Sequence, residues 1–180
     1  MTRTGAGRND APQTAPDVSS GLWARLRLEQ ADSWFLRGVL GLAAAAGLLL
    51  IVAEFLDVFS VYVGGASCEA VASPDVADLC AATGFERHTG ALVVLGLFTL
   101  AMAWGASAGR SRPAGVALLI VGGVVLAVAL LGDLPAVSAE GIIGTRYAEA
   151  RAVPGLGFWL ELVAGALALG AGALRVSRPG

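Results

Sequence analysis

Four long apolar stretches dominate the pattern along the chain, and polar residues gather between them. Each stretch has about 20 residues, the length that an α-helix needs to cross the hydrocarbon core of a bilayer. We therefore predict four spanning helices, at residues 38–58, 89–108, 113–132 and 154–174. The first span is taken to continue past Glu54 and Asp57, because the apolar run extends to Val63.

These spans define one membrane domain at residues 34–176. Residues 1–33 are expected to form a cytoplasmic tail that is disordered at first and ends in a short interfacial helix at residues 21–32. Residues 177–180 form a second, short tail. Because short links favour antiparallel neighbours, the expected fold class is all-α, an integral membrane up-down-up-down four-helix bundle with a disulfide in the first outer loop.

Composition and charge support a membrane location. Hydrophobic residues make up 56% of the chain and charged residues 14%, against roughly 25% charged in a soluble domain. So few charges cannot cover a water-exposed globule. The formal net charge is −2, which gives no reason to expect a nucleic-acid partner. We expect membrane lipid as the main surrounding.

The arginines predict the orientation. Nine of the twelve basic residues lie before the first span, between the second and third spans, or after the fourth: Arg3, Arg8, Arg25, Arg27, Arg37, Arg110, Arg112, Arg175 and Arg178. The other two links hold only Arg87, Arg146 and Arg151. By the positive-inside rule, both termini are cytoplasmic in a multi-pass protein of the cell (plasma) membrane. The first run is too long for a cleaved signal peptide and is interpreted as an uncleaved signal anchor.

Cys68 and Cys80 lie in the first outer loop, with eleven residues between them. In an oxidising compartment we expect them to form a disulfide, which would stabilise the fold by about 3 kcal/mol. The alternative is thiol–disulfide exchange. Four-helix membrane oxidoreductases resemble this chain in span count, but they use a Cys-x-x-Cys pair and a second cysteine pair, so we do not predict an enzyme.

The acidic residues inside predicted spans are the sharpest candidate for chemistry. Glu54 and Glu161 both fall in the outer third of the membrane core, on helices expected to be neighbours, and Asp57 could join them. Two carboxylates in apolar surroundings would share a proton, bind a cation or recruit a basic partner. Alternatively, they reach the interface or pair with basic residues at the outer rim: Arg87, His88, Arg146 and Arg151.

His88 is the only histidine, and it precedes the second span. It could act as a pH sensor, although a solvated interface histidine is the simpler interpretation. One histidine without cysteine ligands does not suggest a zinc site, so no metal is expected. The chain also lacks phosphate-loop, dinucleotide-binding and nucleophile-elbow motifs, and no cofactor or catalytic residue is predicted.

The second outer loop contains a weakly amphipathic stretch at residues 140–151. We expect a short helix lying on the membrane surface, with Arg146 and Glu149 paired across one turn. A lid that binds a partner or ligand is the alternative. Within the spans, small residues recur every fourth position and predict packing seams at Ala101, Gly105, Gly109, Ala164, Ala168 and Gly172.

The second half of the chain carries Gly132-Asp133-Leu134-Pro135 and a further motif from Gly144 to Ala150. In these residues it resembles uncharacterised four-span integral membrane proteins of actinobacteria, a resemblance that implies no activity. The expected function is therefore that of a structural or accessory bundle, acting by association with itself or with a larger membrane complex. The alternative is a small proton- or cation-linked transporter or channel unit that uses Glu54 and Glu161.

Overall fold

The structure is a computed structural model that describes residues 18–108, 111–137 and 140–178, with side chains from residue 33 onward. The chain divides into two compact units, Met1–Trp34 and Phe35–Gly180. Helix α1 (Val18–Ala53) runs through both. The interfacial helix predicted at residues 21–32 is therefore part of α1 and not a separate element, and the first 17 residues of the predicted tail lie outside the described residues.

An apolar helix lies within each of the four predicted spans, although the first ends at Ala53 and not at residue 58. Three segments are long and apolar enough to cross a membrane: Ser33–Ala53, Arg112–Arg146 and Leu156–Ser177. The last is α8, and the second begins with α5 (Arg112–Ala127), which continues into the π-helical turn η2 (Val128–Asp133) and then into α6 (Leu134–Val137). The remaining predicted span forms the shorter apolar helix α4 (Ala91–Ser107).

Apolar side chains from α1, α4, α5 and α8 meet in two buried clusters. The first consists of Val39, Ala43, Ala103, Ala106, Ala114, Leu118 and Ala171. The second consists of Leu50, Ala53, Leu92, Val121, Val125 and Ala164. Each cluster draws on all four helices, so these helices share their core.

Glycines allow the helix backbones to approach closely. A methyl group on Gly122 of α5 would lie 2.6 Å from the backbone nitrogen of Leu169 on α8, and one on Gly172 would lie 2.7 Å from a backbone nitrogen of α5. Gly47 of α1 and Gly96 of α4 face each other in the same way. Any larger residue at these positions would push two helices apart.

The seam predicted on the last span is buried in the structure, with Ala164, Ala168 and Gly172 all inside. The seam predicted on the second span is wrong, because Ala101 is exposed. Helix α4 instead buries a face with Leu92, Gly96, Thr99, Ala103 and Ala106. Gly109 lies outside the described residues.

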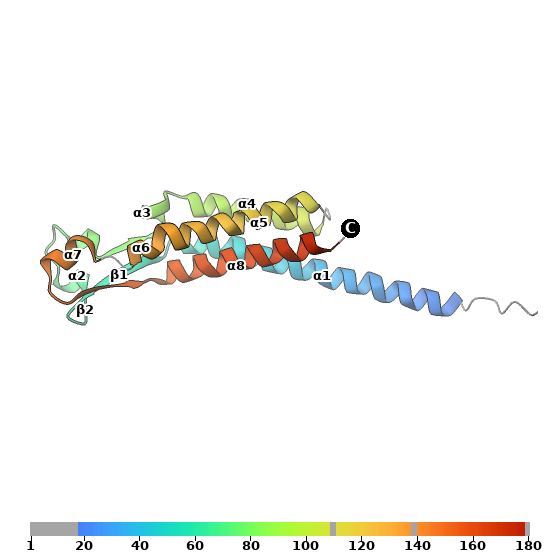
Figure 1. The fold of residues 1–180 in the computed structure, drawn as a ribbon, viewed down its shortest axis with the longest axis horizontal. Helices are drawn as coiled ribbons and strands as arrows, with labels where there is room; N and C mark the ends of the chain where they lie inside the picture. The colour runs from blue at the N-terminus through green and yellow to red at the C-terminus, as the bar shows by residue number, and fades with distance from the viewer. Residues whose placement is uncertain (1–17, 109–110, 138–139, 179–180) are drawn as a thin grey trace, which may run out of the picture. The chain divides into compact units, whose positions relative to one another are not determined.

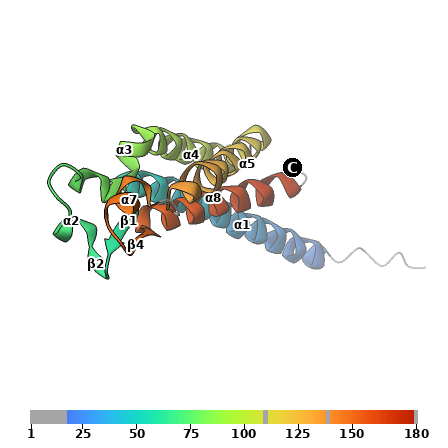
Figure 2. The same ribbon diagram turned by 60° about the vertical axis from the view of Figure 1, so that its left-hand side comes forward.

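A four-stranded antiparallel sheet lies at one end of the helices (Figures 1 and 2). Its central strand β1 (Asp57–Val63) pairs with β2 (Ala66–Ser67), β3 (Ala81–Thr83) and β4 (Ala150–Pro154). Between β1 and β2, Gly64 and Gly65 both have positive φ, as a two-residue hairpin turn requires. We call the sheet, together with α2 (Cys68–Val71), η1 (Ala77–Leu79) and α7 (Gly141–Arg146), the cap.

The cap has its own small core around the two cysteines. Cys68 and Cys80 form a disulfide, as predicted, with their Cα atoms 5.4 Å apart. They pack with further buried residues of the cap: Val61, Val76, Ile143 and Ala150. The disulfide therefore ties both ends of residues 68–80 to the cap core. Ile143 and Ala150, from the link between the third and fourth predicted spans, pack into the same core.

The cap corrects the all-α expectation. Residues 57–63 form a strand and not the end of a spanning helix, because α1 ends at Ala53. The predicted surface helix at 140–151 is also wrong in its second half, since Ala150–Pro154 pairs with β1. Its first half forms α7, in which Ile143 is buried in the cap core and Ile142 is exposed.

Candidate functional site

A polar cluster lies where the cap meets the helices. His88 is the last residue of α3 (Gly84–His88), Asp133 ends the π-helical turn η2, and Glu161 lies in the second turn of α8. Asp133 and Glu161 are fully buried, and the His88 side chain is 12% exposed. We call these three residues the buried triad.

Local sequence fixes the position of α3. Thr83 and Glu86 form a capping box, in which the Glu86 amide donates to the Thr83 hydroxyl and the Thr83 amide donates to the Glu86 carboxylate. The helix ends at Thr89, whose φ of 55° is left-handed. Two basic residues therefore lie together in its last turn: Arg87 and His88.

Asp133 is reached by both basic residues of α3. The Nε atom of Arg87 donates to Oδ1 of Asp133 at 2.7 Å, and an Arg87 amino group donates to the Gly132 carbonyl at 3.3 Å. A π-helical turn shifts the following side chains relative to an α-helix, and such turns are frequent at functional sites. At this turn the neighbouring Leu131 is 78% exposed, whereas Asp133 points into the protein.

His88 lies on the other oxygen of the same carboxylate. Its Nε2 atom is 3.2 Å from Oδ2 of Asp133, although the two atoms are not aligned as a hydrogen bond. The contact of Nε2 with the Asp133 carboxylate, followed by the negative charge of that group, raises the pKa of the His88 imidazole above its ordinary value against the opposing effect of burial. His88 is thus held against an acidic group and does not lie free in solvent.

Glu161 completes the triad and has the most unusual surroundings. Among the described residues, neither of its carboxylate oxygens has a hydrogen-bond partner. One donor atom from each of His88, Asp133 and Glu161 lies within 4.8 Å of the other two. Two buried carboxylates at this distance repel each other unless they share a proton or hold a cation between them. An imidazole and two carboxylates are also a donor set that first-row divalent metals accept.

The structure gives Glu54 a different role from the predicted one. Its carboxylate is fully buried and accepts two hydrogen bonds, from the Gly90 amide at 2.6 Å and from the Leu92 amide at 2.9 Å. These amides lie at the start of α4, whose N-cap is Gly90 and lacks a capping side chain. Glu54 therefore caps α4 from the end of α1, and the partner of Glu161 is Asp133 instead.

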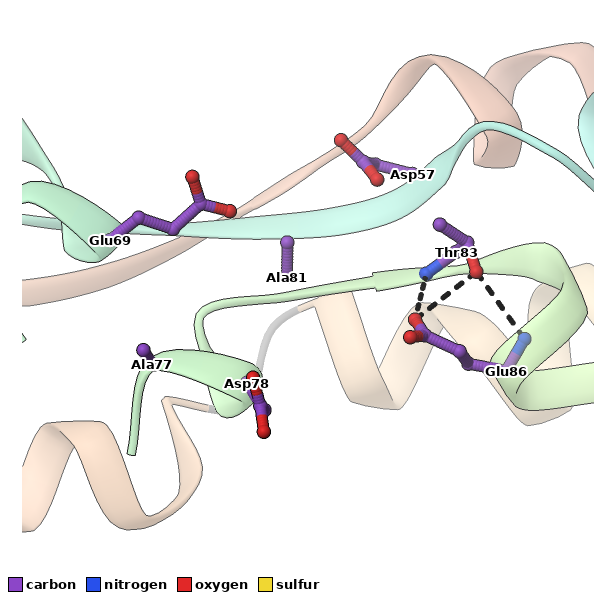
Figure 3. Close-up of a pocket in the computed structure, with 7 residues that line it drawn as sticks. All are labelled: Asp57, Glu69, Ala77, Asp78, Ala81, Thr83 and Glu86. Carbon is purple, nitrogen blue, oxygen red and sulfur yellow. Dashed lines mark hydrogen bonds between the residues drawn. The ribbon is translucent and has the colours of Figure 1, made fainter. Parts of the chain in front are cut away.

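Asp57 does not join Glu161 either. It opens strand β1 with an exposed side chain and lines a groove of about 580 Å³ on the cap. The groove takes carboxylates from four elements: Asp57, Glu69, Asp78 and Glu86 (Figure 3). Figure 3 also shows Glu86 engaged with Thr83, as the capping box requires. The groove is an exposed acidic surface, and it is separate from the buried triad.

The predicted rim residues divide between the triad and the cap. Arg87 and His88 contact an acidic group near Glu161, as one of the alternatives anticipated, but that group is Asp133. Arg146 instead pairs with Asp75 on the cap at 2.7 Å, so its predicted pairing with Glu149 is wrong. Arg151 is exposed on β4.

Two further groups in the cap have shifted acidities. A hydrogen bond from Ser73 and the guanidinium of Arg146 lower the pKa of Asp75. Ser73 also lowers the pKa of Tyr147, first through its side chain and then through its backbone amide, which donates to the phenolic oxygen at 3.1 Å. Asp75 is exposed and Tyr147 is half-buried at the edge of the cap core, so these shifts describe the surface of the cap rather than a buried site.

Sequence reasoning missed Asp133 as a site residue. The predicted third span ends one residue earlier, at Gly132, so Asp133 falls in the predicted outer loop. One signal was available: Asp133 and Glu161 are acidic residues near the cap end of consecutive apolar segments. Two consecutive helices that run antiparallel place the end of the first and the start of the second at the same end of the bundle, so this signal would have placed Asp133 near Glu161.

Comparison of the chain with protein-family models, with curated proteins and with solved structures finds no match. The resemblance to four-span actinobacterial proteins therefore stays a prediction, and the buried triad is interpreted from its own geometry.

Proposed function

We propose that the chain is a four-span protein of the plasma membrane, with both termini in the cytoplasm and the cap outside. Three helices of spanning length and a shorter apolar α4 support this topology. Large side chains on their surfaces are exposed as lipid contact would require, with Trp104 70% and Ile120 61% accessible. The disulfide of the cap suits an oxidising compartment, and the arginine bias suits cytoplasmic termini.

The topology is tested with single cysteines and a membrane-impermeant maleimide on intact cells. Cysteines at Ser73 in the cap and at Ser177 after the last span serve as a matched pair. We expect labelling at the cap position only before lysis, and labelling at both positions afterwards. Labelling of Ser177→Cys on intact cells would reject the orientation.

We propose further that the protein acts by association, as an accessory unit whose cap is the contact surface. The observation that supports this most directly is the cap itself. It is a disulfide-closed module with its own core, and it carries a groove with four carboxylates on its surface. Such a surface favours partners with basic segments, in a second copy of the chain or in a larger membrane complex.

The association is tested by cross-linking in native membranes and by the mass of the particle in detergent. A photo-crosslinking residue at Ala77, which lines the groove, should give a discrete adduct. The same residue at Val94, which is 66% exposed on α4, serves as the control. A monomeric particle without cap-specific adducts would reject the accessory function.

A second candidate is a small transporter or channel unit linked to a proton or another cation. It is favoured by Glu161, a fully buried carboxylate without a hydrogen-bond partner among the described residues. Ionisable groups inside spanning segments usually serve function. Proteoliposomes should then show ion flux that Glu161→Gln abolishes and Asp57→Asn preserves. Absence of flux at every pH tested would reject this candidate.

A further inference from the structure

The carboxylate oxygens of Glu161, Oε1 and Oε2, have no hydrogen-bond partner among the described residues. Beside them, His88 Nε2 and Asp133 Oδ2 form an ion pair at 3.2 Å that lacks hydrogen-bond geometry. Buried polar atoms in folded proteins are nearly always paired, because leaving one unpaired costs about 1–3 kcal/mol. The unpartnered carboxylate of Glu161, next to this poorly aligned ion pair, therefore indicates a missing partner at the triad. A cation would supply that partner, because it accepts electron pairs from one nitrogen and several oxygens.

The charges around the triad point in the same direction. Arg87 is paired with Oδ1 of Asp133 and balances one of the two carboxylates. Glu161 brings a second carboxylate without a paired arginine in the described interactions. A positive ion seated between Asp133 and Glu161 would remove the repulsion that their proximity creates.

Arg87 also resembles the supporting residue of a metal site. Carboxylates that bind a metal through one oxygen are commonly held by a hydrogen bond at the other oxygen. Arg87 occupies Oδ1 of Asp133 in this way and leaves Oδ2 facing His88 and Glu161. The ligand is thus oriented before any ion arrives.

We propose that the buried triad binds a divalent first-row transition-metal ion such as Zn²⁺, through His88 Nε2, Asp133 Oδ2 and the carboxylate of Glu161. The proposal uses the site of the second candidate function but does not require transport. A resident ion there would join α3, η2 and α8, which are distant in sequence, at the boundary between cap and helices.

The donor set distinguishes this class from other ions. Ca²⁺ takes six to eight oxygen ligands, and Mg²⁺ keeps most of its water, so neither uses an imidazole well. Zn²⁺ accepts a nitrogen and two carboxylates at about 2.0–2.2 Å and leaves a fourth position open. The donor atoms, now up to 4.8 Å apart, would close by about an ångström around such an ion.

The test measures metal binding by the purified, tag-free, full-length chain with its disulfide intact. Zn²⁺ is titrated by calorimetry, and Co²⁺ serves as a spectroscopic probe whose d–d absorption reports nitrogen and oxygen ligands. We expect one equivalent of Zn²⁺ to bind and to raise the melting temperature. Glu161→Gln and His88→Gln should each abolish this binding, and Arg87→Met should weaken it by about 10–100-fold.

Two controls keep the test decisive. The double variant Asp57→Asn with Asp78→Asn removes carboxylates of the exposed groove, and it should bind Zn²⁺ as the unmodified chain does. Glu161→Gln preserves shape and removes an unpaired buried charge, so the metal-free variant should melt at or above the temperature of the parent. Its loss of binding could then not be attributed to unfolding.

Unchanged Zn²⁺ binding in Glu161→Gln, loss of binding in the groove variant, or equally tight binding of Ca²⁺ would each overturn the proposal. So would the absence of binding in the folded parent chain. Failure of the second candidate function is recognised separately. Metal binding without ion flux would reject transport alone, and flux that requires Glu161 without metal binding would reject the metal site alone.

Discussion

In the helical region, glycines bring the helix backbones into direct contact, whereas the cap is held by a disulfide, a short sheet and a few buried side chains. The helices have a large apolar surface that lipid can cover, so packing against neighbours decides their arrangement. The cap has too small a core to rely on burial alone, and a covalent bridge compensates for this. The buried triad lies where these two regions meet.

Because different interactions stabilise the two regions, we expect the cap and the helical region to unfold independently of each other. A change in the cap should leave the helices intact, and a change in a helix contact should leave the disulfide formed. The following variants test this separation, beginning with the largest expected effect.

Removing the disulfide should have the largest effect. Cys68→Ser with Cys80→Ser should destabilise the cap by about 3 kcal/mol, since the bridge closes a loop of 12 residues in sequence separation. Hydrogen exchange should accelerate in β1, β2 and β3 and remain slow in α5 and α8. Equal acceleration in the helices would show that cap and helices unfold together.

The glycine contact between α5 and α8 gives the second effect. Gly122→Ala should destabilise the helical region by about 1–3 kcal/mol, because the new methyl group would meet the backbone of α8. Gly123→Ala is the matched control, since nothing lies within 4 Å of its added methyl group. Reversible unfolding in mixed micelles measures both variants. Similar loss in both would contradict a packing origin.

The fold and the chemistry were predictable to different degrees. Apolar helices lie where the four apolar runs predicted them, and three of these helices are long enough to cross a membrane. Strand β1 was missed because its apolar residues were counted as helix length, although Val58, Phe59, Val61 and Tyr62 favour a strand and Gly64-Gly65 favours a hairpin. The cysteine pairing followed from their number and their expected compartment.

The site was predicted less well. The sequence gives the position of an acidic residue along a helix, but it does not show which hydrogen-bond donors lie beside its side chain in the fold. Glu54 and Glu161 are both fully buried, whereas the sequence left open whether they lie inside the bundle or reach the interface. The carboxylate of Glu54 accepts hydrogen bonds from the first amides of α4, because the N-cap residue Gly90 has no side chain to accept them. This contact depends on the residue at which α1 ends. Asp133 is buried at the end of a π-helical turn, which no pattern in the apolar run predicted.

The third prediction concerns the junction of the two regions. Glu54→Gln should cost about 1–2 kcal/mol, since an amide group can accept from one of the two α4 amides but presents a donor to the other. The loss should appear as faster hydrogen exchange at the first turn of α4. Exchange that quickens in the cap before α4 would contradict the capping role.

The smallest effect concerns Asp75 on the surface of the cap. Its pKa is lowered in the folded protein, so the stability that its charge contributes is present above the ordinary value of 3.8 and is lost as the pH falls through the lowered folded-state pKa. The melting temperatures of the parent and of Asp75→Asn should therefore differ at neutral pH and converge on acidification. A difference that grew with acidity would reverse the sign and contradict the assignment.

The capping of α4 by Glu54 has a consequence for the order of assembly. The first amides of α4 find their acceptor on α1, a helix synthesised earlier. An unpaired amide is costly in a bilayer. We therefore expect α1 and α4 to settle in the membrane as a pair, with α5 and α8 added afterwards against their glycine seam. A carboxylate that looked like a transport residue would then act during biogenesis.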